Sequence, residues 1–183
     1  MTISVSRVAF FNYMLYICRN QPYKSVMKQR VELSGFCVIS TAICLVLFFV
    51  SFFFIPEIWW QITWGCFISI LLIICLCYMP MSIGADEKAI YINRSLKVKT
   101  IPISSIKTVD LYTPSAGAIR TCGSGGFLGY WGWFRDRKIG KYFAYYGKSS
   151  DCFLIKLKNG HKYILGCKNA PDMVEYINKL IKK

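Results

Sequence analysis

The sequence predicts a transmembrane α-helical hairpin followed by a small all-β or α+β domain. Three observations lead to this prediction. Residues 33–81 contain a single charged side chain, although the whole chain carries a net charge of +14. The residues after this block form short alternating segments of apolar and polar residues, which are typical of strands. The last residues of the chain repeat their apolar side chains with the period of an amphipathic helix.

The composition fits a membrane protein with reduced cysteines. Apolar residues make up 55% of the chain and charged residues 17%, less charge than a water-facing surface normally carries. Five of the nine cysteines lie inside the apolar block, where cysteine behaves as a small hydrophobic residue. The other four show no paired spacing, and His161 is the only histidine. We therefore expect neither disulfides nor a metal site nor a cofactor.

The apolar block divides into two predicted spans. Residues 33–55 form a run of 23 residues without charge, and residues 59–78 form a second run of 20. About 20 apolar residues cross the hydrocarbon core of a bilayer as a helix. Backbone polar groups in lipid must be bonded internally, which favours helices over isolated strands. The segment 55–58, with Pro56 and Glu57, is expected to form the turn of a two-helix hairpin over residues 33–81.

The distribution of charge predicts the orientation. Lysine and arginine residues lie on both outer flanks of the spans, whereas the turn carries only Glu57. The positive-inside rule then places both termini in the cytoplasm and Glu57 on the opposite side of the membrane. Lys28 and Arg30 precede the first span, where cations meet anionic headgroups.

Residues 1–32 are expected to form a basic cytoplasmic N-terminal segment. The apolar stretch 8–18 is too short to cross a bilayer, and no small-residue cleavage site follows it as in a signal peptide. An alternative is that translation starts at Met27, directly before the first span.

Residues 84–183 are expected to form the soluble domain, with about seven short antiparallel strands and one C-terminal helix. Alternation over residues 96–101 predicts a strand whose outward face carries Lys97 and Lys99. The stretch 116–140 is expected to be irregular. The predicted strands are 89–92, 96–101, 107–112, 141–146, 152–157 and 162–165.

A C-terminal helix is predicted from Asn169 onward, because asparagine is a good N-cap and Pro171 suits a first turn. Its apolar face is expected to cover the open end of a strongly bent sheet. That face consists of Met173, Val174, Ile177, Leu180 and Ile181.

The glycine-aromatic stretch 120–132, RTCGSGGFLGYWG, together with 139–142 and the Asn159–Gly160 turn, resembles a membrane-anchored branch of the bacterial pleckstrin-homology-like (PH-like) domain family. The resemblance covers about residues 83–181. It implies a PH-like barrel that has no catalytic chemistry and serves as a binding or assembly module. It implies no particular binding residues.

The same stretch is the best candidate for a functional site, with three interpretations. It could expose backbone amides to an anion, as nucleotide-binding glycine loops do, but it lacks the Gly-Lys-Ser/Thr ending and the βαβ setting of such loops. It could be a loop in which glycine permits tight packing beneath aromatic rings. Alternatively, its aromatic residues enter the lipid headgroup region or contact a partner, with cations beside them. The candidate contact residues are Arg120, Leu128, Tyr130, Trp131, Trp133, Phe134, Arg135, Arg137, Lys138 and Lys141.

These observations predict a non-catalytic integral membrane protein that presents a basic PH-like domain at the cytoplasmic membrane face. Its expected partners are anionic lipid headgroups, another protein or a second copy of the chain, and not nucleic acid. The alternative is an accessory component of a membrane transporter or of a lipid-modifying enzyme complex. The spans argue against a transport path, because ionisable residues usually line such paths and the spans carry none.

Overall fold

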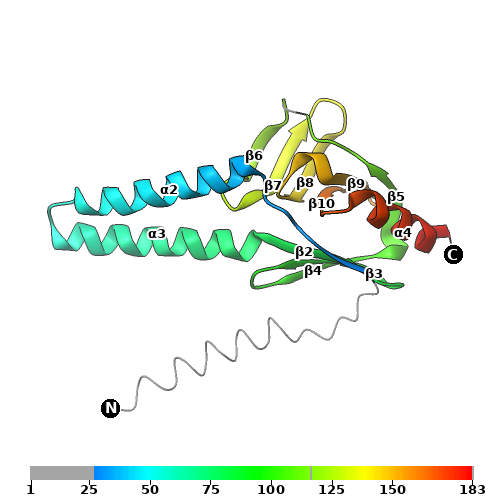
Figure 1. Cartoon of the computed structure of the whole chain (residues 1–183), viewed down its shortest axis with the longest axis horizontal. Helices are drawn as coiled ribbons and strands as arrows, with labels where there is room; N and C mark the ends of the chain where they lie inside the picture. The colour runs from blue at the N-terminus through cyan, green and yellow to red at the C-terminus, as the bar shows by residue number, and fades with distance from the viewer. Residues whose placement is uncertain (1–26, 116, 183) are drawn as a thin grey trace, which may run out of the picture.

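The computed structural model describes residues 27–115 and 117–182, and it consists of two helices that project from one end of a β-rich domain (Figure 1). Helix α2 (Gly35–Phe53) and helix α3 (Ile58–Tyr78) lie side by side. Ser34 caps α2, because its hydroxyl accepts a hydrogen bond from the Cys37 amide at 3.2 Å. The two helices and the turn between them confirm the helical hairpin predicted from the sequence.

Both helices have the length and composition needed to cross a membrane. With 19 and 21 residues, they extend about 28 Å and about 32 Å at 1.5 Å per residue, close to the thickness of a hydrocarbon core. Of the residues in these two helices, only Cys37 is buried. Their apolar side chains are therefore left uncovered by the rest of the described chain, unlike those of a core helix in a soluble protein.

The β-rich domain contains two sheets. The first has the strand order β1-β2-β3-β4, and the second has the order β5-β9-β10-β8-β7-β6. All pairs are antiparallel except β8 with β10. Helix α4 (Ala170–Lys182) follows the last strand. The strands are β1 (Met27–Arg30), β2 (Pro80–Ala85), β3 (Ala89–Arg94), β4 (Val98–Pro102), β5 (Ile106–Leu111), β6 (Ile119–Gly126), β7 (Gly129–Asp136), β8 (Gly140–Tyr146), β9 (Cys152–Leu157) and β10 (Lys162–Gly166).

The prediction of a barrel with about seven antiparallel strands is wrong in detail. The described residues form ten strands, and the two sheets do not close into a barrel. Strand β4 is an edge strand that pairs only with β3. At this edge the two sheets are joined by side chains and not by backbone hydrogen bonds. Lys99 Nζ on β4 donates to the Tyr163 hydroxyl on β10 at 3.0 Å.

Strand β1 brings the residues before the helices into the domain. It pairs with β2 in a register that runs from Met27 opposite Ala85 to Arg30 opposite Ser82. The last part of the predicted N-terminal segment 1–32 is therefore an element of the first sheet. Residues 1–26, which include the apolar stretch 8–18, lie outside the described residues, so the alternative start at Met27 stays a prediction.

The main hydrophobic core lies between the two sheets and α4. Alternate residues of β3, Ile90 and Ile92, are fully buried in it. Met173 and Ile177 enter it from α4, which confirms the predicted apolar face of that helix. Burial of each such side chain contributes roughly 1.5–3 kcal/mol.

A second cluster covers the other face of the six-stranded sheet. Strands β5 and β6 form opposite edges of this sheet, so the chain between them crosses that face. Asp136 fastens the crossing segment, because its carboxylate accepts hydrogen bonds from the Tyr112 hydroxyl at 3.1 Å and the Ser115 hydroxyl at 2.7 Å. The cluster contains Phe134, Tyr142, Ala144, Tyr146, Cys152, Leu154 and Ile164.

The predicted outward orientation of Lys99 is wrong. Lys99 lies opposite Ile92 in the β3–β4 register. Residues directly opposite each other in an antiparallel pair share a face. Because Ile92 is a core residue, Lys99 is on the core side, at the place where the sheets stay apart.

Candidate membrane-facing surface

The glycine-aromatic stretch forms the β6–β7 hairpin, so the predicted irregular segment is in fact two strands of eight residues each. Gly123 and Gly132 lie opposite each other, with φ angles of 120° and 118°. A Cβ atom on either glycine would come within 2.1–2.2 Å of a backbone oxygen on the other strand. Glycine is therefore required at this pair, and its lack of a side chain hides the alternation that would have predicted a strand.

The tip of this hairpin lies against α2. The Leu128 amide donates to Thr41 Oγ1 at 2.9 Å. A Cβ atom at Gly126 would lie 2.9 Å from the Phe36 ring, so the hairpin backbone lies directly against that side chain of α2. The Ser124 hydroxyl donates to the Phe127 carbonyl at 2.7 Å. The tip is thus bonded to the helix and to itself.

Gly147 forms a second attachment of the domain to the start of α2. Its carbonyl accepts hydrogen bonds from the Ser34 amide at 2.9 Å and from Cys37 Sγ at 3.5 Å. A Cβ atom at Gly147 would lie 2.3 Å from the Glu32 carbonyl oxygen. The segment that enters α2 is therefore held against the turn that follows β8.

The contact between the end of α3 and β7 shows how far the hairpin tip extends along the helices. The Tyr78 ring stacks on Trp131 with centroids 5.3 Å apart. Leu128 lies three residues beyond Trp131, about 10 Å farther along the strand at about 3.3 Å per residue. Its partner Thr41 lies six residues after Gly35, about 9 Å along α2. Both measures place the tip about 10 Å past the level at which the helices join the domain.

The structure brings together part of the predicted contact residues. Leu128 is at the tip, and Tyr130 stacks on Tyr146 with centroids 4.7 Å apart. Trp131 is 8% exposed and Phe134 is 4% exposed. Trp131 and Phe134 are therefore core residues that have little surface left for a membrane or a partner.

Of the cations among the predicted residues, only Arg120 reaches the tip. Arg137 and Lys138 lie in the turn between β7 and β8, at the opposite end of β7 from the tip, and β7 itself extends about 24 Å at 3.4 Å per residue. Arg120 is exposed on β6, and its guanidinium Nη1 would lie 3.4 Å from a Cβ atom at Gly125, so its charge is beside the tip. Arg135 is exposed near the far end of β7.

Trp133 and Lys141 lie between the tip and that far end. Lys141 Nζ lies 4.8 Å from the Trp133 ring centroid. The predicted residues therefore form a row along β7 and β8 that leads away from the helices, and they do not form one patch.

Two surface features near the helices were not predicted. Phe127 belongs to the hairpin tip and is half-buried. The β3–β4 turn also lies at the helix end of the domain (Figure 1), because Arg94 pairs with Pro80 directly after α3. Leu96 in this turn is 43% exposed. The turn itself was visible in the sequence, but its location depends on β2, whose glycine and proline conceal a strand.

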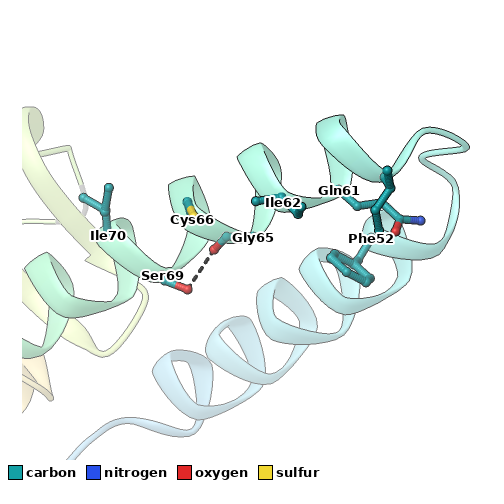
Figure 2. A pocket seen from close by; sticks show the side chains of 8 residues that line it. Phe52, Gln61, Ile62, Gly65, Cys66, Ser69 and Ile70 are labelled. Atoms are coloured by element: carbon teal, nitrogen blue, oxygen red, sulfur yellow. Dashed lines mark hydrogen bonds between the residues drawn. The ribbon is translucent and has the colours of Figure 1, made fainter.

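A shallow apolar groove runs between α2 and α3 (Figure 2). Phe52 on α2 and Ile62 on α3 contribute to its walls. The Gln61 amide donates to the Ile55 carbonyl at 2.8 Å. Ser69 Oγ donates to the Gly65 carbonyl at 2.7 Å. The polar side chains of the groove are thus bonded within the hairpin.

The buried ionisable groups of the domain have structural roles. Burial raises the pKa of the Cys152 thiol and raises the pKa of Cys167 to about 12, so both stay protonated and unreactive. Hydrogen bonds from the Lys138 amide and from Ser115 lower the pKa of Asp136. Within residues 27–115 and 117–182, no group of three potential metal ligands comes together.

The bounds of the domain agree with those of a known family. The sequence model of the bacterial PH domain matches residues 81–181, from the second residue of β2 to the last turn of α4. No curated protein and no solved structure shows significant similarity to the chain. The family match covers more than half of the chain. The protein therefore belongs to the bacterial PH domain family and carries two long apolar helices N-terminal to its PH-like domain.

Proposed function

We propose that the protein is a non-catalytic integral membrane protein whose PH-like domain is seated on the cytoplasmic leaflet of the bacterial inner membrane. In this proposal α2 and α3 cross the bilayer, and the domain meets anionic lipid headgroups. One observation carries the proposal: the uncharged β6–β7 tip extends about 10 Å alongside α2, beyond the level at which the helices join the domain.

The chemistry of the tip supports insertion into the boundary of the bilayer. Residues 125–130 contain no charge. The Leu128 amide donates a hydrogen bond to the Thr41 hydroxyl, and the Phe127 carbonyl accepts one from the Ser124 hydroxyl. Lipid requires such internal bonding, because no water is available to satisfy backbone groups.

The far end of the helical hairpin supports the same placement. Trp59 and Trp60 are 77% and 64% exposed beside the turn, and tryptophan favours the boundary between lipid and water. Only Glu57 is charged in that region, whereas the opposite flanks are basic. The positive-inside rule then favours a cytoplasmic PH-like domain.

The connections leave the domain little freedom relative to the helices. Only Met79 separates α3 from β2, and residues 31–34 separate β1 from α2. We therefore expect the domain to present one fixed face to the bilayer surface. Each Lys or Arg near an anionic leaflet adds roughly 1 kcal/mol to this attachment.

Washing inverted inner-membrane vesicles with alkaline carbonate tests the anchoring. We expect the full-length protein to stay in the membrane. Topology is tested with a membrane-impermeant maleimide, because Cys122 is exposed on β6. Cys122 should react in inverted vesicles and not in intact spheroplasts, and an E57C variant should react at the new cysteine in intact spheroplasts.

Release by carbonate, or labelling of Cys122 from outside, would overturn the proposal. If crosslinking in native membranes joins the exposed face of the domain to one protein and not to lipid, the headgroup interpretation is overturned in favour of a protein partner.

A further inference from the structure

A second surface of the PH-like domain combines cations with aromatic rings. It lies where the two sheets fail to close, between β3–β4 on one side and β7, β8 and β10 on the other. We call it the cation–aromatic cluster. It consists of Tyr78, Arg94, Lys99, Trp133, Lys141, Phe143, Tyr145 and Tyr163.

Each cation of the cluster lies over aromatic rings. The Arg94 guanidinium carbon is 5.5 Å from the Tyr78 ring centroid and 5.7 Å from that of Tyr145. Lys99 Nζ is 4.5 Å from the Tyr163 centroid. Cation–π contacts of this kind hold the positive groups in place.

The cluster is continuous along strand β8. Phe143 contacts the Trp133 ring edge-on at 5.1 Å and lies 4.8 Å from the Tyr145 ring. Lys141, Phe143 and Tyr145 are alternate residues of β8 and share one face, over about 13 Å. Tyr145 lies at the end near Tyr78 and the helices, and Lys141 lies at the outer end.

Among the residues that the structure describes, the cations of this cluster have no acidic ion-pair partner. Within the described parts of the chain, none of the four ion pairs involves Arg94, Lys99 or Lys141. Arg94 Nε and the neighbouring Trp131 Nε1 are buried and have no hydrogen-bond acceptor there. Arg94 Nη1 and Lys99 Nζ donate to the neutral hydroxyls of Tyr145 and Tyr163 at 3.4 Å and 3.0 Å, so an anionic oxygen would be a stronger acceptor for both cations.

We propose that the cation–aromatic cluster binds the phosphate group of an anionic phospholipid, with Arg94 and Lys99 as its main contacts. The inference rests on the proposed function, because Tyr78 ends α3 and places Arg94 at the level of the lipid phosphates. Arginine suits this role, since its planar guanidinium binds phosphate oxygens through two parallel hydrogen bonds. A water-soluble phosphate ester offers the same chemistry, and the experiment separates the two sources.

The test uses the full-length protein in nanodiscs of phosphatidylcholine with a small fraction of phosphatidylglycerol. Native mass spectrometry measures the phosphatidylglycerol that stays bound after transfer to detergent. We expect the R94Q/K99Q variant to retain at least about tenfold less than the wild type, because two charge-assisted contacts are lost. The K107Q/K158Q control removes two exposed lysines from elsewhere on the domain and should behave as the wild type.

Two further variants separate binding from folding. R94K/K99R keeps both charges and should restore retention to a large extent. Thermal unfolding of each variant is followed in the same nanodiscs, and K99Q alone replaces the double variant if that variant unfolds. Retention that is equal in wild type and a folded R94Q/K99Q or K99Q variant overturns the proposal.

The remaining outcomes identify the source of the ligand. Glycerol 3-phosphate is added to the protein in pure phosphatidylcholine nanodiscs, and a shift in the melting temperature reports binding. A shift that R94Q/K99Q abolishes overturns the lipid as the source and leaves a phosphate site. An equal loss of phosphatidylglycerol in R94Q/K99Q and K107Q/K158Q overturns the site itself, but the proposed anchoring would stand. Failure of the proposed function would be seen separately, as release of the wild type by carbonate.

Discussion

Replacing Gly147 with alanine tests the attachment between the PH-like domain and α2. The added methyl carbon would lie 2.3 Å from the Glu32 carbonyl oxygen, 2.9 Å from the Glu32 carbonyl carbon and 3.0 Å from Leu33 Cα. All three are backbone atoms, so rotating a side chain cannot relieve the overlap. Gly147 is not among the glycines with positive φ. The substitution therefore adds a steric effect and no intrinsic backbone strain.

The size of this effect follows from what must move. The segment before α2 has to shift away, which breaks the 2.9 Å hydrogen bond between the Ser34 amide and the Gly147 carbonyl. Such a bond contributes about 1 kcal/mol, and overpacking costs about 1–3 kcal/mol more. The attachment should therefore weaken by about 2–4 kcal/mol, which raises its opening equilibrium by about 30-fold to 900-fold.

Hydrogen exchange followed by mass spectrometry measures this opening in full-length protein in nanodiscs. We expect faster exchange in peptides covering residues 31–38 and 126–131, while peptides from β9 and β10 stay protected. G117A is the matched control, because a Cβ atom at Gly117 has nothing within 4 Å. Unchanged exchange over residues 31–38 in G147A would show that the attachment does not exist as described.

Two further predictions concern single polar groups. T41V removes the acceptor of the Leu128 amide, so hydrogen exchange at that amide should become faster, by about fivefold to 150-fold for a loss of 1–3 kcal/mol. The control is T63V, because the Thr63 hydroxyl donates to the Trp59 carbonyl within α3, and it should leave exchange at Leu128 unchanged. Equal exchange in both variants would contradict the contact. The carboxylate of Asp136 has a pKa lowered below its ordinary value of 3.8 by hydrogen bonds, so its contribution to stability is present above about pH 4 and is lost as the pH falls through the folded-state pKa. Melting temperatures between pH 6 and pH 3 should therefore fall less steeply in D136N, which starts from a lower value at neutral pH, and parallel curves would refute this assignment.

The elements that the sequence predicts correctly are those encoded by local patterns. The spans follow from uninterrupted runs without charge, and α4 follows from the spacing of Met173, Val174 and Ile177. Strands β1 and β2 were missed because Met27 pairs with Ala85 across the whole helical hairpin. A pattern in neighbouring residues cannot predict a strand pairing between segments so far apart in the sequence.

The direction in which a side chain points was harder to predict than the strand on which it lies. Lys99 resembles a surface residue by type, but the β3–β4 register turns it toward the second sheet. The β6–β7 hairpin was hidden because glycines occupy positions where strands normally show apolar side chains. Here glycine is required by close backbone approach, as at Gly123 and Gly132.

Of the two candidate surfaces, the hairpin tip was partly predictable from local sequence, whereas the cation–aromatic cluster was not. Leu128 and the aromatic residues around it stood out by composition, although their contact with α2 did not. Neither Arg94 nor Lys99 was among the predicted contact residues, because the cation–aromatic cluster is assembled from β3, β4, β7, β8, β10 and the end of α3. Only the folded chain brings these side chains together.

Photocrosslinking from the two ends of β7 tests the central claim most directly, namely that the domain sits on the bilayer with its β6–β7 tip inserted. The photoreactive amino acid p-benzoylphenylalanine is introduced in place of Phe127 at the tip or of Lys138 in the far turn, and the full-length protein is irradiated in its native membrane. Mass spectrometry should find lipid adducts at position 127 and none at position 138. Lipid adducts at neither position, or equally at both, would contradict a domain seated on the membrane in this orientation.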